Sequence, residues 1–312
     1  MRPHLPIHAS LVLTAFFWGS AFNVGAHVVA TLPPLTASAE RFALACAVLF
    51  AALAWRGRLS TGGLARHWPA LLAVGLFGVA GFMIAMFVGL RATHPVNAAL
   101  IMGTSPLWTL LLAAALGAEP LHRWRLAGMA CALAGVALVV ADGRAPHGLR
   151  PAWGDLVVLA GALSWALATV ISRRYLSTVP PLQTTAWSSL AGTAMLLVLA
   201  AILERPWEAM ANAGPGVHAG VVYLAVCSSA LGYLFWFNAT ARLGAARTAT
   251  YFNLVPVATV VIALATGQRA SLLQAAGIVA VITGMLLAGR RTPPAVGAEC
   301  PGTNAHAGNA AG

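Results

Sequence analysis

Apolar runs alternate with short polar segments along almost the whole chain. A helix that crosses a membrane needs about 20 apolar residues, and ten runs come close to or exceed that length. The predicted helices are Leu11–Ala30, Leu35–Trp55, Trp68–Leu90, Val96–Gly117, Leu126–Ala141, Leu156–Ser172, Leu182–Leu203, Val217–Phe237, Thr248–Thr266 and Leu272–Gly289. The fifth and sixth runs are short, so we expect their helices to extend into the flanks. The pattern predicts an all-α integral membrane protein with ten transmembrane helices.

Composition excludes two other classes of protein. The 312 residues are 60% hydrophobic and only 8% charged, with a mean hydropathy of +0.82. A soluble domain carries about 25% charged residues, and a disordered chain needs low hydrophobicity and high charge. Of the 18 basic and 7 acidic residues, only Glu40 and Arg41 fall inside a predicted helix.

The net charge of +11 is explained by orientation in the membrane. Such a charge can indicate nucleic-acid binding, but these arginines are spread over separate loops, so we expect no nucleic-acid partner. With the N-terminus inside, twelve loop arginines lie on the cytoplasmic side and five outside. This bias predicts that both termini are cytoplasmic. The first helix is too long for a signal peptide and is expected to be retained.

The two halves of the chain resemble each other. Three residues recur at an offset of 150: Pro106 with Pro256, Thr109 with Thr259 and Gly117 with Gly267. In the leading helices, Trp18 corresponds to Trp165 approximately. We therefore expect a first repeat over residues 11–141, a second over 154–289 and a disordered tail over 290–312. Five helices per repeat is an odd number, which predicts two inverted five-helix repeats, as in many secondary transporters.

The paired prolines predict helix breaks. A proline frees the carbonyl four residues earlier, which is that of Met102 for Pro106 and that of Phe252 for Pro256. A freed carbonyl at membrane depth must meet protein or a water-filled cavity. Both prolines are thus candidates for lining a transport path, the alternative being kinks that only shape packing.

Several motifs in this order resemble a known family. They are Trp18-Gly19-Ser20 in the first helix, Arg41 early in the second, SPLWTLLLAAALGAE at the end of the fourth, and GDLVVLAGALSWALATVISRR in the second half. Over roughly Leu11 to Gly289 the chain resembles two tandem EamA domains of the drug/metabolite transporter superfamily. The resemblance implies a ten-helix permease of the cell inner membrane, usually an exporter of amino acids, other metabolites or drugs. Where the first copy reads Gly117-Ala118-Glu119, the second has Gly267-Gln268-Arg269 and no acid.

Glu40 and Arg41 are the sharpest functional candidates. They lie about 9 Å along the helix from its outer start, and a charge at the bilayer centre costs at least about 2.5–3.5 kcal/mol. We expect Arg41 to attract an anionic group such as a carboxylate, and Glu40 to carry a proton. The alternatives are that Arg41 extends to the interface or anchors a loop, and that Glu40 only neutralises nearby positive charge.

Ser20, Asn23 and His27 share one face of the first helix. The hydroxyl and amide are candidates for binding substrate, and the imidazole for proton coupling. Hydrogen bonding between helices is the alternative for this face and is slightly favoured. A solvated histidine near the outer end is the simpler explanation for His27.

Aromatic residues complete the candidate site. We expect Trp18, Trp165 and Tyr251 to face a cavity, with Asn253 hydrogen bonding to substrate, because aromatic and a few polar groups suit an amphipathic organic molecule. Trp236, Trp55 and Trp68 are expected instead in an interfacial belt. The glycine pairs Gly128/Gly135 and Gly277/Gly284 are expected to serve helix packing, and the resemblance makes these helices the place to seek a homodimer contact.

The sequence therefore predicts a secondary transporter, an exporter of small organic metabolites that works by alternating access. Its partners would be a small-molecule substrate and the lipid bilayer, and we expect no cofactor, no metal and no catalytic residue, since no nucleotide-binding or catalytic metal motif occurs. Proton antiport and facilitated export both stay open. The alternatives from other classes are an intramembrane enzyme and a non-transporting membrane scaffold.

Overall fold

The computed structural model describes residues 5–57, 59, 64–115, 123–141, 153–243, 250–267 and 271–288. Every element in these ranges is helical, so the predicted all-α fold is confirmed. The elements are α1 (Leu5–Thr31), α2 (Pro34–Trp55), η1 (Leu64–His67), α3 (Trp68–Gly75), η2 (Leu76–Gly81), α4 (Phe82–Leu90), α5 (Pro95–Gly103), α6 (Ser105–Ala115), α7 (Arg123–Ala141), α8 (Trp153–Tyr175), α9 (Pro181–Leu203), α10 (Pro206–Asn212), α11 (Pro215–Tyr223), η3 (Leu224–Leu231), α12 (Gly232–Leu243), η4 (Thr250–Asn253), α14 (Leu254–Ala265) and α15 (Leu272–Ala288). Glu119, Gln268, Arg269 and the tail over 290–312 lie outside the described residues.

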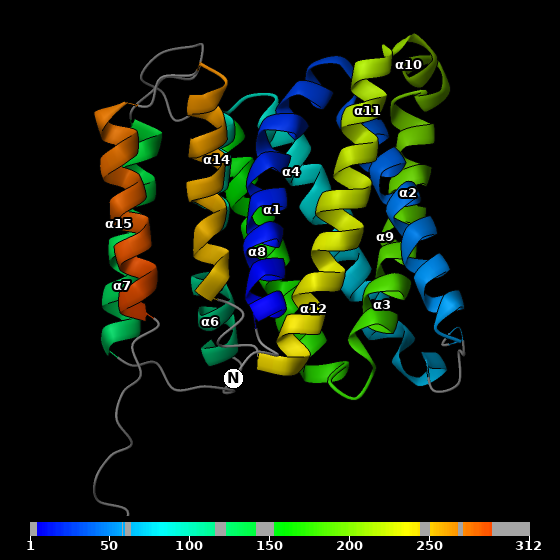
Figure 1. The fold of residues 1–312 in the computed structure, drawn as a ribbon, viewed down its shortest axis with the longest axis horizontal. Helices are drawn as coiled ribbons and strands as arrows, with labels where there is room; N and C mark the ends of the chain where they lie inside the picture. The colour runs from blue at the N-terminus through cyan, green and yellow to red at the C-terminus, as the bar shows by residue number, and fades with distance from the viewer. Residues whose placement is uncertain are drawn as a thin grey trace, which may run out of the picture.

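The long helices stand side by side in one bundle (Figure 1). Within the described residues, six helices are long and apolar enough to cross a membrane: Ile7–Thr31, Pro34–Trp55, Trp68–Leu90, Trp153–Ser172, Pro181–Leu203 and Pro215–Trp236. The other predicted segments are occupied by shorter or broken helices, namely α5–α6, α7, η4–α14 and α15. As expected, the fifth and sixth helices extend into their flanks, since α7 begins at Arg123 and α8 runs to Tyr175.

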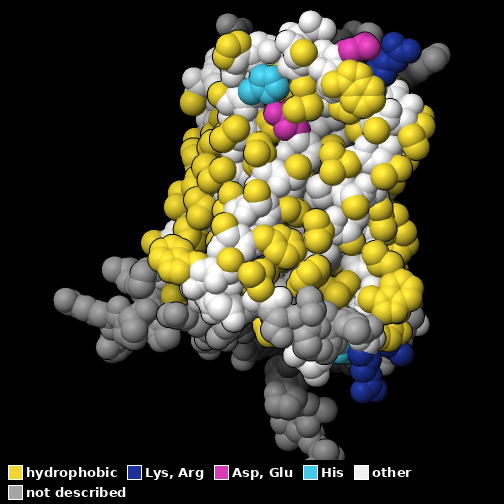
Figure 2. Space-filling view, turned by 90° about the vertical axis from the view of Figure 1, so that its right-hand side faces the viewer, with side chains coloured by type: hydrophobic (Ala, Val, Ile, Leu, Met, Phe, Trp, Pro, Cys, Tyr) yellow, Lys and Arg dark blue, Asp and Glu magenta, His cyan; other side chains and the backbone are white. Residues whose placement is uncertain are grey.

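The surface is that of a protein immersed in lipid. On the face seen in Figure 2, hydrophobic side chains cover the middle of the bundle, and the charged side chains gather near its ends. Large apolar residues are widely exposed, among them Ile202 at 71% and Val279 at 64%. A soluble monomer does not expose apolar surface on this scale, so the chain is a multi-pass membrane protein.

Corresponding helices of the two halves each contain a π-helical segment, which the sequence pattern did not predict. η2 interrupts the helix that runs from Trp68 to Leu90, and η3 interrupts the one from Pro215 to Leu243. A π segment leaves backbone carbonyls poorly paired within the helix. Here the first helix of the opposite half supplies a donor to each segment: Ser164 Oγ donates to Phe77 O at 2.7 Å, and Trp18 Nε1 donates to Ser228 O at 2.9 Å.

The helix breaks predicted from the paired prolines are present. α5 ends at Gly103 and α6 begins at Ser105, while the 3₁₀ turn η4 precedes α14. The carbonyl of Met102 accepts a hydrogen bond from Ser105 Oγ at 2.6 Å, so a neighbouring side chain satisfies it. The two breaks also meet, because the Pro256 ring lies 3.4 Å from the position that a Cβ would occupy at Gly103.

The glycines of α7 and α15 serve close packing, as predicted. A Cβ at Gly135 would lie 2.7 Å from the carbonyl oxygen of Gly277, so the two backbones approach too closely for any side chain. This is the small-residue packing typical of membrane helices. The α7–α15 pair forms one edge of the bundle (Figure 1).

Candidate functional site

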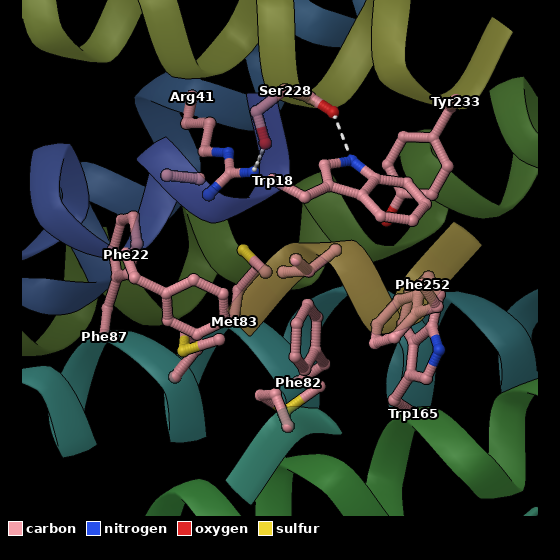
Figure 3. A pocket seen from close by; sticks show the side chains of 14 residues that line it. Trp18, Phe22, Arg41, Phe82, Met83, Phe87, Trp165, Ser228, Tyr233 and Phe252 are labelled. Atoms are coloured by element: carbon pink, nitrogen blue, oxygen red, sulfur yellow. Dashed lines mark hydrogen bonds between the residues drawn. The ribbon is translucent and has the colours of Figure 1, made fainter. Parts of the chain in front are cut away.

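A cavity lies where the two halves of the chain meet (Figure 3). The space open to the centres of water molecules is about 70 Å³, enough for several waters or for part of a small ligand. The lining comes from helices of both halves and consists of Trp18, Ala21, Phe22, Arg41, Phe82, Met83, Met86, Phe87, Met102, Trp165, Ser228, Tyr233, Phe252 and Val255. Aromatic rings and methionines dominate it, as in sites for amphipathic organic molecules.

Arg41 is the one charged residue among those that line the cavity. Its side chain extends from α2 and is buried, with 7% exposure. Nε donates to Ser229 Oγ at 3.0 Å and Nη2 donates to Ser228 Oγ at 3.0 Å, so η3 of the second half fixes the guanidinium. No carboxylate among the described residues forms a salt bridge with it. The site therefore offers a positioned cation to an anionic group.

The predicted cavity residues Trp18 and Trp165 both line it. Trp18 contacts Tyr233 at a ring-centroid distance of 6.0 Å, and Trp165 contacts Phe82 at 5.2 Å. In Figure 3, Tyr233, Phe252 and Trp165 lie toward the side away from Arg41, with Trp18 between them. This arrangement can hold an apolar or aromatic group while its anionic end faces Arg41.

Trp236, predicted for an interfacial belt, ends a candidate span and contacts the aromatic rings of the cavity wall. Its ring lies 5.0 Å from that of Trp18 and 6.1 Å from that of Phe252, so it supports the cavity wall. Trp55 and Trp68, with 94% and 59% exposure, are placed as a belt would require.

The polar face of α1 contacts other helices rather than the cavity. Ser20 Oγ lies 2.6 Å from Tyr223 OH. Asn23 Nδ2 donates to Thr259 O at 3.4 Å, and its buried Oδ1 has no partner among the described residues. Both contacts match the alternative of hydrogen bonding between helices, and His27 is exposed.

Tyr251 lies away from the cavity. Its hydroxyl is 2.6 Å from Nδ1 of His8, near the start of α1, and its neighbour Phe252 lines the space instead. The side chain of Asn253 is outside the described part of the chain. Pro106 and Pro256 are not among the lining residues, although Met102 and Val255 beside the breaks are.

Glu40 pairs with His218, which no pattern in the sequence singled out. Its Oε1 lies 2.9 Å from Nδ1 of His218 on α11, and Nε2 of His218 is 3.0 Å from the carbonyl oxygen of Met210. His218 is a polar residue in an otherwise apolar helix, and that position was the signal in the sequence that it has a polar partner. Ser228 and Ser229 were also missed as partners of Arg41, although two adjacent hydroxyls in a spanning helix usually seek a partner.

Comparison with known proteins gives a consistent result. The model of the EamA-like transporter family matches residues 6–141 and again 152–290. The uncharacterized transporter YyaM of Bacillus subtilis is 34% identical, over 91% of this chain and 94% of its own. A protein of Streptantibioticus cattleyicolor named "Probable terminal-alkyne amino-acid exporter" is 30% identical, over 91% and 93%. A protein of Escherichia coli named "Probable amino-acid metabolite efflux pump" is 27% identical, over 88% and 92%.

A solved crystal structure aligns with 89% of this chain and 94% of its own at a TM-score of 0.64 and 24% identity, which shows a shared fold alone. The family-model match covers both halves of the chain, in agreement with the resemblance found in its motifs. The relatives are named as transporters and exporters rather than as enzymes. The chain belongs to the EamA-like transporter family.

Proposed function

We propose that the protein is a secondary transporter that exports small amphipathic metabolites bearing a carboxylate, by alternating access. The relatives named for the export of amino acids or their metabolites support this substrate class. In this proposal Arg41 binds the carboxylate, and Trp18, Trp165 and Phe252 contact the apolar part of the molecule.

The observation that carries the proposal is the buried guanidinium between the two halves. A buried charge without a counter-ion is costly, and Arg41 has only neutral hydroxyls as hydrogen-bond partners. An anionic substrate would offset that cost and would bridge helices of both halves. Binding would thus act on the contact between Arg41 and η3, which must change when the cavity opens to one side of the membrane and then to the other.

The proposed topology has ten spans in two inverted five-helix repeats, with both termini in the cytoplasm and the chain in the inner membrane. Six candidate spans, the two family-model matches and the excess of arginine in alternate loops support it. The corresponding π segments and helix breaks add structural support, because discontinuous helices near the repeat interface are typical of transporter substrate sites.

The test is flux in reconstituted liposomes. Purified protein is screened for uptake and release of amphipathic amino acids, their non-amino carboxylic analogues and cationic drugs, with and without a pH gradient. We expect flux of carboxylates that is lost in Arg41→Ala and retained in Arg56→Ala, a matched change at an exposed arginine after α2. Absence of flux for every compound, together with wild-type export by Arg41→Ala cells, would reject the proposal. Flux that does not depend on the pH gradient would exclude proton antiport but not the rest of the proposal.

A further inference from the structure

A second polar site lies outside the cavity, where α2, α10 and α11 meet. These helices are neighbours at the end of the bundle opposite the marked N-terminus (Figure 1). Glu40 and His218, which are 178 residues apart in the chain, are joined here by the 2.9 Å contact between Oε1 and Nδ1. The other carboxyl oxygen of Glu40 is buried and has no partner among the described residues. The imidazole is therefore the group that holds this carboxyl.

The hydrogen bonds of the imidazole determine how many protons the pair contains. The carbonyl oxygen of Met210 can only accept, so Nε2 of His218 must carry a hydrogen. A neutral imidazole has a single N–H, which would leave a lone pair on Nδ1 facing Glu40. A hydrogen bond at 2.9 Å then requires one more proton, either on Nδ1 of an imidazolium or on the carboxyl group of a neutral Glu40.

We propose that Glu40 and His218 together bind a single exchangeable proton, and that this proton fastens α10 and α11 to α2. When the proton leaves to solvent, the neutral imidazole has one N–H for two acceptors. If Nε2 keeps the hydrogen for the Met210 carbonyl, the Nδ1 lone pair faces a carboxylate oxygen and the contact with α2 becomes repulsive; the other tautomer gives up the bond to α10 instead. His218 is 34% exposed at its side chain, so water can exchange the proton, whereas Glu40 is only 11% exposed. This inference goes beyond the proposed function, because it requires no substrate and no particular driving force.

In the described part of the chain, the other ionisable groups on the elements packed against α2 have partners elsewhere or are exposed, apart from the free thiol of Cys227. Glu204 accepts hydrogen bonds from the start of α2, and Arg91 donates to carbonyls at the end of α1. The remaining contacts are Arg41 with Ser228 and Ser229, Glu208 with Arg205, Tyr223 with Ser20, and Cys46 with Thr193, while His27 is exposed and Cys227 is a free thiol. Among the described residues, none of them forms a hydrogen bond or ion pair with Glu40 or His218, so one proton accounts for the change that we expect.

The test measures the distance between α2 and α11 as pH changes, by double electron–electron resonance in nanodiscs without substrate. The native cysteines are first replaced by serine. Spin labels are then attached to cysteines introduced in place of Leu44 and Val222, which are exposed on these helices. We expect a single short distance at low pH and a longer population at high pH. The ratio of the two should change about tenfold per pH unit, as for one proton.

Three variants separate the proton from the contact. In Glu40→Gln, the amide N–H donates to Nδ1 of a neutral His218, so we expect the short distance at every pH. In His218→Ala the contact is absent, so we expect the longer population at every pH. Glu208→Gln, which alters an exposed ion pair on α10, should behave as wild type.

Two results would overturn the inference: a wild-type distance that does not depend on pH, or a Glu40→Gln variant that keeps the wild-type transition. If His218→Ala fails to fold, Glu40→Gln still decides the question, because it keeps the hydrogen bonds of the site. The measurement is independent of transport. A negative result here would leave the carboxylate flux expected above untouched, and absence of flux would leave this inference standing.

Discussion

Replacing Arg41 should weaken substrate binding by a predictable amount. Two of its three guanidinium nitrogens are already used, since Nε and Nη2 donate to Ser229 and Ser228. No described residue accepts a hydrogen bond from Nη1, which leaves this nitrogen for a substrate carboxylate. A hydrogen bond to a charged group contributes about 1.5–3 kcal/mol, so Arg41→Ala should lower affinity by roughly 10- to 150-fold.

The conservative variant sharpens this prediction. Arg41→Lys keeps a positive charge, but an ammonium group cannot reproduce the planar fork that bonds two serines and a carboxylate together. We therefore expect affinity between those of wild type and Arg41→Ala. Ser228→Ala should produce a smaller loss, because it removes one of the two bonds that orient the guanidinium.

The assay is binding or concentration-dependent flux of the best carboxylate substrate in liposomes, with melting temperature measured on the same preparations. An equal loss for substrates with and without a carboxylate would refute the reasoning, since it would mean that Arg41 only maintains structure. Wild-type affinity in Arg41→Ala would refute it as well.

Three further changes test other contacts. Trp18→Phe keeps an aromatic ring but loses the bond to the π segment, so flux should fall about 2- to 12-fold, whereas Trp55→Phe, at a 94% exposed position, should leave it unchanged. Gly192→Ala would place a Cβ 2.4 Å from that of Val79 and should destabilise the bundle by about 1–3 kcal/mol. Gly214→Ala, which has open space around it, should not lower the melting temperature, so equal melting temperatures for the two variants would contradict this prediction. Glu204→Ala removes the acceptor for two backbone amides and one hydroxyl at the start of α2. Those amides should exchange hydrogen faster and the stability should fall by about 1–2 kcal/mol; an unchanged exchange rate would contradict the capping role of Glu204.

The sequence was sufficient for the helices and for part of the site because those features depend on local composition. Apolar run length located the helices, and the rarity of charge within them singled out Arg41 and Glu40. The helix starts also follow from local chemistry, since a proline begins α2, α5, α9 and α11 and has no N–H that would be left unpaired there.

The sequence was insufficient for contacts between residues that are far apart in the chain. His218 acquires its role only because folding brings it to Glu40, and nothing in its neighbourhood along the chain indicates that contact. The carbonyls of Ser228 and Phe77 in the π segments likewise find their donors, Trp18 and Ser164, in the opposite half.

The π segment η3 has a consequence for how the cavity could be disassembled. A π turn contains about one residue more than an α turn of the same length. Moving that extra residue by one turn along the helix would rotate the intervening side chains by about 100°, the angle per residue of an α-helix. Ser228 and Ser229 lie within this segment. Such a shift would turn both hydroxyls away from Arg41 while the ends of the helix stayed in place, so the guanidinium would lose its two serine partners by a local change of register, without the bundle coming apart.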